Sequence, residues 1–146
     1  MRISSKGRYG LAAMLVMAQS YHPNQCVTIL SIAEKLGISK IYLEQVFSLL
    51  KRADLVTSIK GAQGGYQLTR PLDQITVGEI LLSIETSLFE KTETSVLDEA
   101  IEKTMNQMVW QVLDDTVLMT LNHITLATLK EELAKHNPEE NYMFYI

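Results

Sequence analysis

The sequence has little cysteine, proline or glycine: its 146 residues include one Cys, three Pro and seven Gly. The single cysteine, Cys26, cannot form a disulfide within one chain, so the fold must rest on packing and we expect a reducing, cytoplasmic location. No apolar run approaches the roughly 18–20 residues that cross a bilayer. The start, "MRISSKGRYG", also lacks the hydrophobic stretch of a secretory signal. We therefore expect no membrane association.

Patterns of catalytic and metal-binding residues are missing as well. No Ser/His/Asp, Cys/His or paired-carboxylate arrangement is present, so we expect no catalytic residues and no enzyme. One cysteine and three scattered histidines (His22, His123 and His136) cannot supply the ligands of a closed zinc site. The sequence therefore predicts no metal site.

Charge is divided unevenly along the chain, although the net charge is only −4. Residues 1–70 carry nine Lys and Arg against three Asp and Glu, whereas residues 71–146 carry four against fourteen. The first part therefore has a formal charge of +6 and the second −10. This division indicates that the first part meets a polyanion and the second meets protein or solvent. Two solvated surfaces that happen to differ in charge would give the same pattern.

The first part of the sequence predicts three helices. Residues 4–21 have helical apolar spacing with Ser4 or Ser5 as N-cap, and a second helix with Leu30, Ile32, Ala33 and Leu36 on its apolar side ends at Gly37. Ser39 begins a third helix, in which we expect Ile41, Leu43, Val46, Phe47 and Leu50 to be buried. The short turn between the last two helices is typical of a helix-turn-helix. Any α-hairpin in a helical bundle could share this spacing.

The segment "SIKGAQGGYQLTRP", residues 58–71, has three glycines within five consecutive positions. A phosphate-binding loop would run from a strand into a helix and end with a Lys and a Ser or Thr. Here β-type alternation stands on both sides of the glycines, so the segment predicts a β-hairpin. The predicted fold is mainly α with a small β-hairpin: a winged helix-turn-helix domain followed by a long helix. A hairpin without any binding role remains open.

Three segments resemble the Rrf2 family of bacterial transcription regulators over nearly all of residues 1–86. They are "ISSKGRYGLAAML", "SIAEKLGISKIYLEQVFSLLKRADLVTSIKGAQGGYQLTRP" and "ITVGEILLSIE". The resemblance implies a dimeric winged-helix protein that binds double-stranded DNA, with a long C-terminal helix crossing to the partner subunit. We accordingly expect a DNA-binding domain at residues 1–86 and a helical dimerisation region with a C-terminal tail at residues 87–146. An adaptor that binds only protein is the competing class, but it would not need the basic first half.

The expected DNA-binding residues fall into three groups. Cations near the start of the first helix would hold phosphates: Arg2, Lys6 and Arg8. Side chains of the third helix would reach base edges: Ser39, Lys40, Tyr42, Glu44 and Gln45. Tyr42 has a phosphate as its alternative partner, and Lys51 on the same helix is a further expected DNA contact. The tip of the hairpin would carry Lys60 and Gln63.

The acidic second half predicts the dimer contact. Apolar residues at helical spacing form a stripe that is too wide to stay in water: Leu97, Ile101, Met105, Met108 and Val112. Two such helices about a two-fold axis would hold the reading helices about 34 Å apart, which implies a palindromic operator. Trp110 lies off this stripe, so we expect it to pack on the winged domain or on a neighbouring chain.

Many members of the Rrf2 family hold an iron–sulfur cluster through three cysteines after the "VGEI" helix. The corresponding stretch, "TSLFEKTETSVLDEAIEKTM", has no cysteine, so we expect no cofactor and no iron–sulfur cluster. The sequence is more similar to a cluster-free branch, the repressors of cysteine metabolism in Firmicutes, which it also resembles in its last residues, "YMFYI". That resemblance implies O-acetylserine thiol-lyase as a partner, bound through Tyr145 and Ile146. Packing of this tail on the dimer is the alternative.

Cys26 lies just before the helix-turn-helix. A redox signal through this thiol, or an unknown small ligand, is the alternative to control by a partner enzyme. A cysteine that only packs in the core is also compatible with the sequence.

Overall fold

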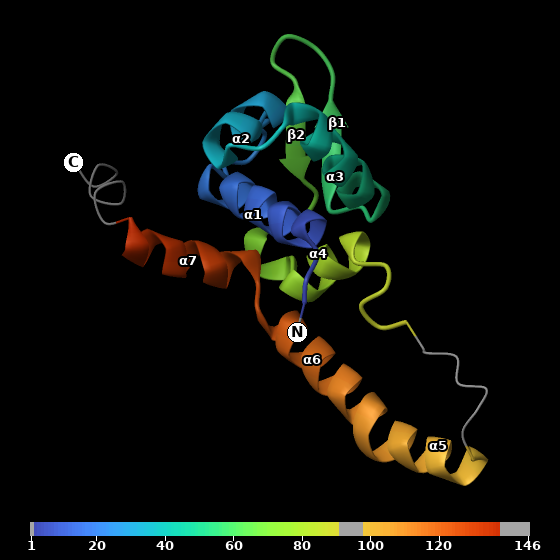
Figure 1. The fold of residues 1–146 in the computed structure, drawn as a ribbon. Helices are drawn as coiled ribbons and strands as arrows, with labels where there is room; N and C mark the ends of the chain where they lie inside the picture. Colours follow the sequence, from blue (N-terminus) through green and yellow to red (C-terminus); the bar gives the residue numbers. More distant parts are fainter. Residues whose placement is uncertain (1, 91–97, 138–146) are drawn as a thin grey trace.

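The computed structural model of the chain describes residues 2–90 and 98–137 (Figure 1). Leu97, Tyr145 and Ile146, named above, lie outside the described residues. The elements are α1 (Ser5–Gln19), α2 (Ile29–Leu36), α3 (Lys40–Arg52), β1 (Val56–Ile59), β2 (Gly65–Leu68), η1 (Leu72–Gln74), α4 (Val77–Ile84), α5 (Glu99–Met105), η2 (Asn106–Trp110), α6 (Gln111–His123) and α7 (Leu126–His136). The predicted fold class, mainly helical with one β-hairpin, is confirmed.

Side-chain caps start α1 and α3 where the sequence predicts. Ser4 Oγ accepts a hydrogen bond from the N–H of Gly7 at 3.0 Å, and Ser39 Oγ accepts one from the N–H of Tyr42 at 3.1 Å. Each bond satisfies a backbone donor that has no partner within the helix. Gly37 ends α2 with φ = 67°, a left-handed conformation that glycine adopts at low cost. These signals fix the sharp turn between α2 and α3.

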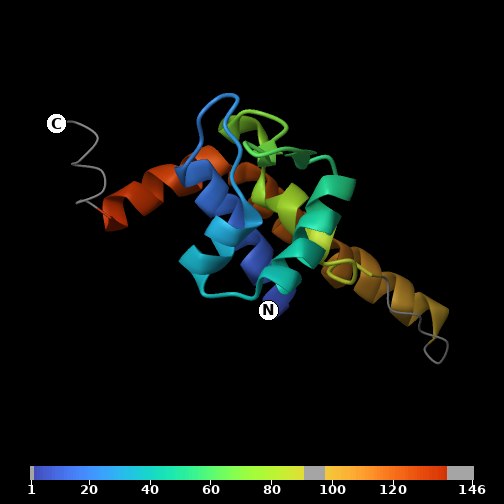
Figure 2. The same ribbon diagram turned by 90° about the horizontal axis from the view of Figure 1, so that it is seen from above.

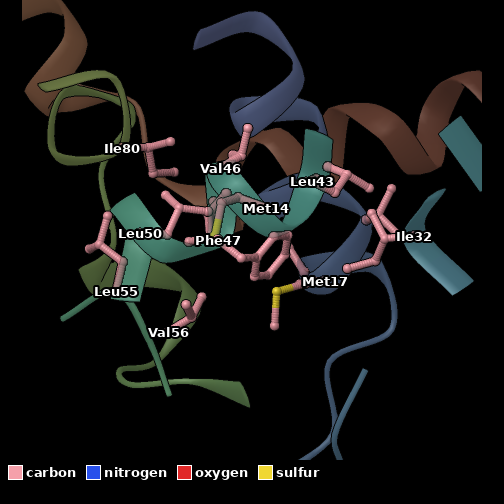
Figure 3. Packing of buried hydrophobic residues seen from close by; sticks show 14 of the residues in the cluster. Met14, Met17, Ile32, Leu43, Val46, Phe47, Leu50, Leu55, Val56 and Ile80 are labelled. Atoms are coloured by element: carbon pink, nitrogen blue, oxygen red, sulfur yellow. The ribbon is translucent and has the colours of Figure 1, made fainter. Parts of the chain in front are cut away.

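The hydrophobic core lies between α1, α2, α3 and the strands, with Phe47 among its central side chains (Figure 3). The ring of Phe47 packs against that of Tyr66 on β2, with centroids 4.8 Å apart. This contact ties the hairpin to the buried side of α3. The other large, fully buried side chains are Met14, Ile32, Leu43, Val46, Leu50, Leu55, Val56, Ile75, Ile80 and Leu126.

One residue that we expected in the core is exposed. Ile41 is 70% exposed, so the prediction of its burial was wrong, and Leu30, which we expected on the apolar side of α2, is 53% exposed. The buried residues of α3, from Leu43 to Leu50, recur at spacings of three and four. Ile41 precedes Leu43 by two residues, about 200° around the helix, and therefore projects away from the core. For α2 the buried pair is Ile32 and Ala33, and Leu30 again lies two residues before it.

Strands β1 and β2 pair antiparallel, from Val56 opposite Leu68 to Ile59 opposite Gly65. The segment before α2 joins them, because Val27 and Tyr66 exchange two backbone hydrogen bonds of 2.8 Å. Gly65 is needed here: its φ is 148°, and a β-carbon would lie 2.7 Å from the carbonyl oxygen of Val27. The predicted hairpin is confirmed, and it is anchored to the entrance of the helix-turn-helix.

Residues 98–137 form one long helix that leaves the domain and a shorter one that returns to it. Helices α5 and α6 run together through the π-helical turn η2 and project away from the other elements (Figures 1 and 2). Helix α7 then packs against α1, and Leu126 at its start is fully buried in the core. The backbone N–H of Leu126 bonds the carbonyl of Ile75 at 3.0 Å. Residues from the second half therefore complete the core of the first.

Trp110 is 50% exposed in the π-helical turn. The prediction that it packs on the winged domain of its own chain was therefore wrong. The long helix carries it away from that domain, which leaves a neighbouring chain as the predicted contact.

We expect Leu126→Ala to lower the free energy of unfolding by about 2–5 kcal/mol, because it removes a fully buried side chain and leaves a cavity. The matched control is Leu30→Ala, the same substitution near the start of another helix. Since Leu30 is 53% exposed, this change should cost less than about 1 kcal/mol. Urea denaturation of both variants measures the difference, and equal losses would contradict the placement of α7 in the core.

Candidate nucleic-acid interface

Three basic elements are held in one arrangement by contacts between them. The rings of Tyr9 on α1 and Tyr42 on α3 meet edge to face, with centroids 5.8 Å apart and planes at 88°. At the other end of α3, Lys51 Nζ donates a hydrogen bond of 2.8 Å to Ser58 Oγ on β1. These contacts join α3 to α1 near one end and to the hairpin at the other.

The start of α1 carries the first predicted group of cations. Arg2 and Arg8 are exposed, and Lys6 is half-buried. The dipole of a helix start favours an anion at the same place. The start of α1 is therefore a candidate site for contact with a phosphate.

A carboxylate from another element also reaches the start of α1. Glu85, just after α4, accepts a hydrogen bond from the backbone N–H of Ser4 at 2.8 Å and another from the Ser4 hydroxyl. A side chain on Gly7 would collide with this carboxylate, so the glycine permits the approach. Sequence reasoning missed this contact because the two partners are 81 positions apart and no local pattern joins them.

Helix α3 presents most of the second predicted group to solvent. Ser39, Lys40, Glu44 and Gln45 are exposed. Lys40 and Glu44 form an ion pair at 3.9 Å, so each is held by the other beside the helix start. Tyr42 is half-buried against Tyr9, which makes it a contact between helices as well as a candidate phosphate ligand.

The hairpin tip carries the third group, Lys60 and Gln63, both exposed. The backbone turns at Gly61, where φ is 112°, and the N–H of Gly64 bonds the carbonyl of Gly61 at 3.0 Å. Such a positive φ explains why the sequence uses glycine at the tip. The turn closes on itself and leaves both polar side chains free to meet a partner.

An ion pair braces the base of the hairpin. Arg70 donates hydrogen bonds of 2.9 Å to Glu79 Oε1 and to the carbonyl of Gln74. Partial burial raises the pKa of Glu79, but hydrogen bonds from the Thr76 backbone and from Arg70, with the positive charge of Arg70, outweigh it and the pKa is lowered. Glu79 also completes a capping box with Thr76 at the start of α4.

The long helix leaves a broad apolar surface exposed. Of the residues predicted for the dimer contact, Ile101, Met108 and Val112 are exposed and Met105 is half-buried. Further exposed apolar side chains on the same helix are Val109, Trp110, Leu113 and Met119. So many exposed apolar side chains make this helix a candidate interaction surface.

Cys26 is half-buried near the place where Val27 meets β2. Beside it lies a pocket of about 200 Å³ between the end of α1, residues 20–25 and β2. Met17, Tyr66 and Leu68 form part of its lining. Both features adjoin the base of the hairpin.

A family model named Rrf2, described as "Iron-dependent Transcriptional regulator", matches residues 3–132. The chain belongs to the Rrf2 family of transcriptional regulators. It is 38% identical to the transcriptional regulator CymR of Bacillus subtilis over the full length of both proteins. It is also 38% identical to IscR of Erwinia tasmaniensis over 130 residues, which cover 88% of this chain and 78% of that protein.

Solved structures agree with this assignment. The structure of CymR, called the global cysteine regulator of B. subtilis, matches with a TM-score of 0.75 and 35% identity, covering 90% of this chain and 98% of that one. The oxidized form of Staphylococcus aureus CymR matches with a TM-score of 0.69 and 35% identity, covering 90% and 97%. The relatives are named as regulators of transcription, in agreement with the expectation that the chain is not an enzyme.

The expectation that the protein needs no cofactor is contradicted by these comparisons. The matching family model is described as iron-dependent, and IscR proteins are among the relatives. Within residues 2–90 and 98–137, no group of three or more His, Cys, Asp or Glu side chains is placed to hold a metal ion. The described residues thus do not fit an iron–sulfur cluster held by one chain.

In the part of the chain that the structure describes, no helix is both long and apolar enough to cross a membrane.

We expect Glu79→Gln to make the stability of the protein less sensitive to acid. The pKa of Glu79 is lower in the folded chain, so the unfolded chain binds a proton first as the pH falls below about 4.3. The stabilisation by this carboxylate is present above that pH and is lost as the pH falls through the lowered pKa. Arg70→Met should have a similar effect, because it removes the charged partner.

Urea denaturation between roughly pH 7 and pH 3 measures this dependence. Wild type should lose more stability over that range than either variant. Equal losses in all three proteins would contradict a role for the ion pair.

Proposed function

We propose that the protein is a homodimeric repressor that binds palindromic operators through α1, α3 and the hairpin. The observation that carries the proposal is the fixed arrangement of three basic elements, with α3 held between the other two. Family membership supports DNA as the polyanion. The formal charge of +6 on residues 1–70 supplies the attraction that a phosphate backbone requires.

The proposed contacts divide into positioning and reading. Arg2, Lys6 and Arg8 neutralise phosphates beside the start of α1, while Lys60 and Gln63 bring the hairpin to the neighbouring backbone or minor groove. Lysine is a point charge without the two-pronged geometry of arginine, so Lys60 adds attraction more than base selection. On α3, Gln45 is suited to adenine and Glu44 to the amino group of cytosine.

Dimerisation places two copies of this surface on one duplex. The exposed apolar side chains of α5, η2 and α6 support a second copy as the partner, because a helix with so much apolar surface is stabilised by packing against another helix. Two-fold symmetry then requires a palindromic site with half-sites about one helical turn apart.

Genes of cysteine and sulfur metabolism are the proposed targets. The support is the similarity over the full chain to CymR of B. subtilis, a protein called the global cysteine regulator of that organism.

O-acetylserine thiol-lyase is the proposed co-regulator. We propose Tyr145 and Ile146 as the residues through which the chain binds this enzyme. A partner enzyme that senses its own substrate would link DNA binding to the supply of cysteine precursors.

A redox signal through Cys26 is the second candidate for control. An oxidized form of S. aureus CymR has been solved, and Cys26 is the single cysteine of the present chain. Its position beside the Val27–Tyr66 contact would let oxidation displace the hairpin.

Removal of Lys6 and Arg8 should weaken DNA binding and its dependence on salt. In a homodimer the double variant Lys6→Ala/Arg8→Ala loses four phosphate contacts, so the slope of log K against log salt should become shallower by about 3–4. Fluorescence anisotropy on an operator selected from random duplexes measures this slope.

The control for that experiment is Lys103→Ala/Lys130→Ala, which removes the same charge from α5 and α7. Its slope should stay within about 1 of wild type. A shallower slope in both variants would mean that net charge, and not the start of α1, governs binding.

The co-regulator is tested with the same operator and purified O-acetylserine thiol-lyase. We expect the enzyme to strengthen DNA binding and O-acetylserine to reverse this effect. A chain lacking residues 142–146 should bind DNA alone as wild type does but should not respond to the enzyme. An unchanged response would contradict the role of the tail, and no response in wild type would contradict the partnership and favour Cys26.

A further inference from the structure

An isoleucine occupies the part of α3 that points away from the protein. Four residues of α3 lie opposite its buried side at spacings of four, three and four: Ile41, Gln45, Ser48 and Arg52. All four are exposed, and we call them the outer face of α3. Ile41 is the apolar member of this face, and it is 70% exposed.

Stability of the isolated chain does not explain this isoleucine. The side chain is absent from the hydrophobic core and from the partly buried residues packed against it. A β-branched residue also favours a helix less than alanine does. An exposed apolar side chain at this position is therefore better explained by a contact with a partner.

The surroundings of Ile41 indicate the chemistry of that partner. Lys40 precedes it, Ser39 caps the helix start, and Gln45 follows one turn later on the same face. Hydrogen-bonding and cationic side chains around one apolar group match the major groove, where base edges carry donors and acceptors and thymine adds a methyl group. The first residues of a reading helix are those that reach base edges.

We infer that Ile41 contacts the C5 methyl group of a thymine in each half-site and selects for that base. The inference rests on the proposed DNA binding and adds a base preference to it. Cytosine offers hydrogen at the corresponding carbon, and a purine offers a polar atom, so either would leave the isoleucine without an apolar partner. Gln45, one turn along the face, would then select a neighbouring base by hydrogen bonds.

The test replaces a single methyl group in the DNA. Full-length protein is used to select an operator from random duplexes, and each thymine is then replaced in turn by deoxyuridine, which differs only by that methyl group. For wild type, one thymine in each half-site should be sensitive, with a loss of affinity of about fourfold per half-site. For Ile41→Ala, the thymine and deoxyuridine operators should bind within about 1.5-fold of each other.

Two controls separate this effect from a change in folding. Alanine favours a helix, so Ile41→Ala should unfold at the same urea concentration as wild type or higher. Leu82→Ala removes another exposed apolar side chain, on α4, and should keep the wild-type preference for thymine.

The outcomes distinguish a failure of the contact between Ile41 and thymine from a failure of the proposed DNA binding. Wild-type protein that binds its operator but ignores every deoxyuridine would overturn the contact with thymine while DNA binding stands. Sensitivity that persists in Ile41→Ala would also overturn it, because another residue would then hold the methyl group. Failure to select any duplex would overturn the proposed function itself, and Ile41 would then belong to a contact with protein.

Discussion

The packing of α3 around Phe47 is the constraint on which the rest of the structure depends. Leu43, Val46, Phe47 and Leu50 are fully buried, and Phe47 also contacts Tyr66 on the hairpin. Because a helix is rigid, burial of one side fixes the direction of every side chain on the other. The core therefore determines which residues of α3 can read DNA, and it holds the hairpin beside them with the same aromatic contact.

The acidic half of the chain contributes to this constraint as well as to assembly. Helix α7 inserts Leu126 into the core and packs on α1. The long helix formed by α5, η2 and α6 carries its exposed apolar side chains away from the domain. One segment thus supports the core of the winged domain and also presents the surface that we propose for a second copy. Helix α7 and the bonds of Glu85 to Ser4 both connect this half of the chain to α1.

Local signals in the sequence predicted most of the fold. The caps at Ser4 and Ser39, the glycine at position 37 and the glycine-rich hairpin tip each act within a few residues, so they can be identified without a structure. The errors came from contacts between distant segments and from the phase of short helices. Ile41 was expected in the core together with the other apolar residues of α3, although its spacing from Leu43 puts it on the opposite side of the helix. The contact of Glu85 with the start of α1 has no local signature.

The expectation about the cofactor failed for a different reason. The lack of cysteines shows that one chain cannot supply the usual ligands of an iron–sulfur cluster. The family match, in contrast, is to regulators described as iron-dependent. Ligand counting in one sequence therefore does not decide whether a regulator of this family depends on iron.

The central claim is that two copies of the α3 surface bind one palindromic duplex. Hydroxyl-radical footprinting of the full-length protein on its selected operator tests it most directly, with a second duplex in which five base pairs are inserted between the half-sites. We predict two protected stretches on the same side of the native duplex, about one helical turn apart, and loss of one stretch after the insertion turns that half-site to the opposite side. A single protected stretch on the native operator, or protection unchanged by the insertion, would contradict the account.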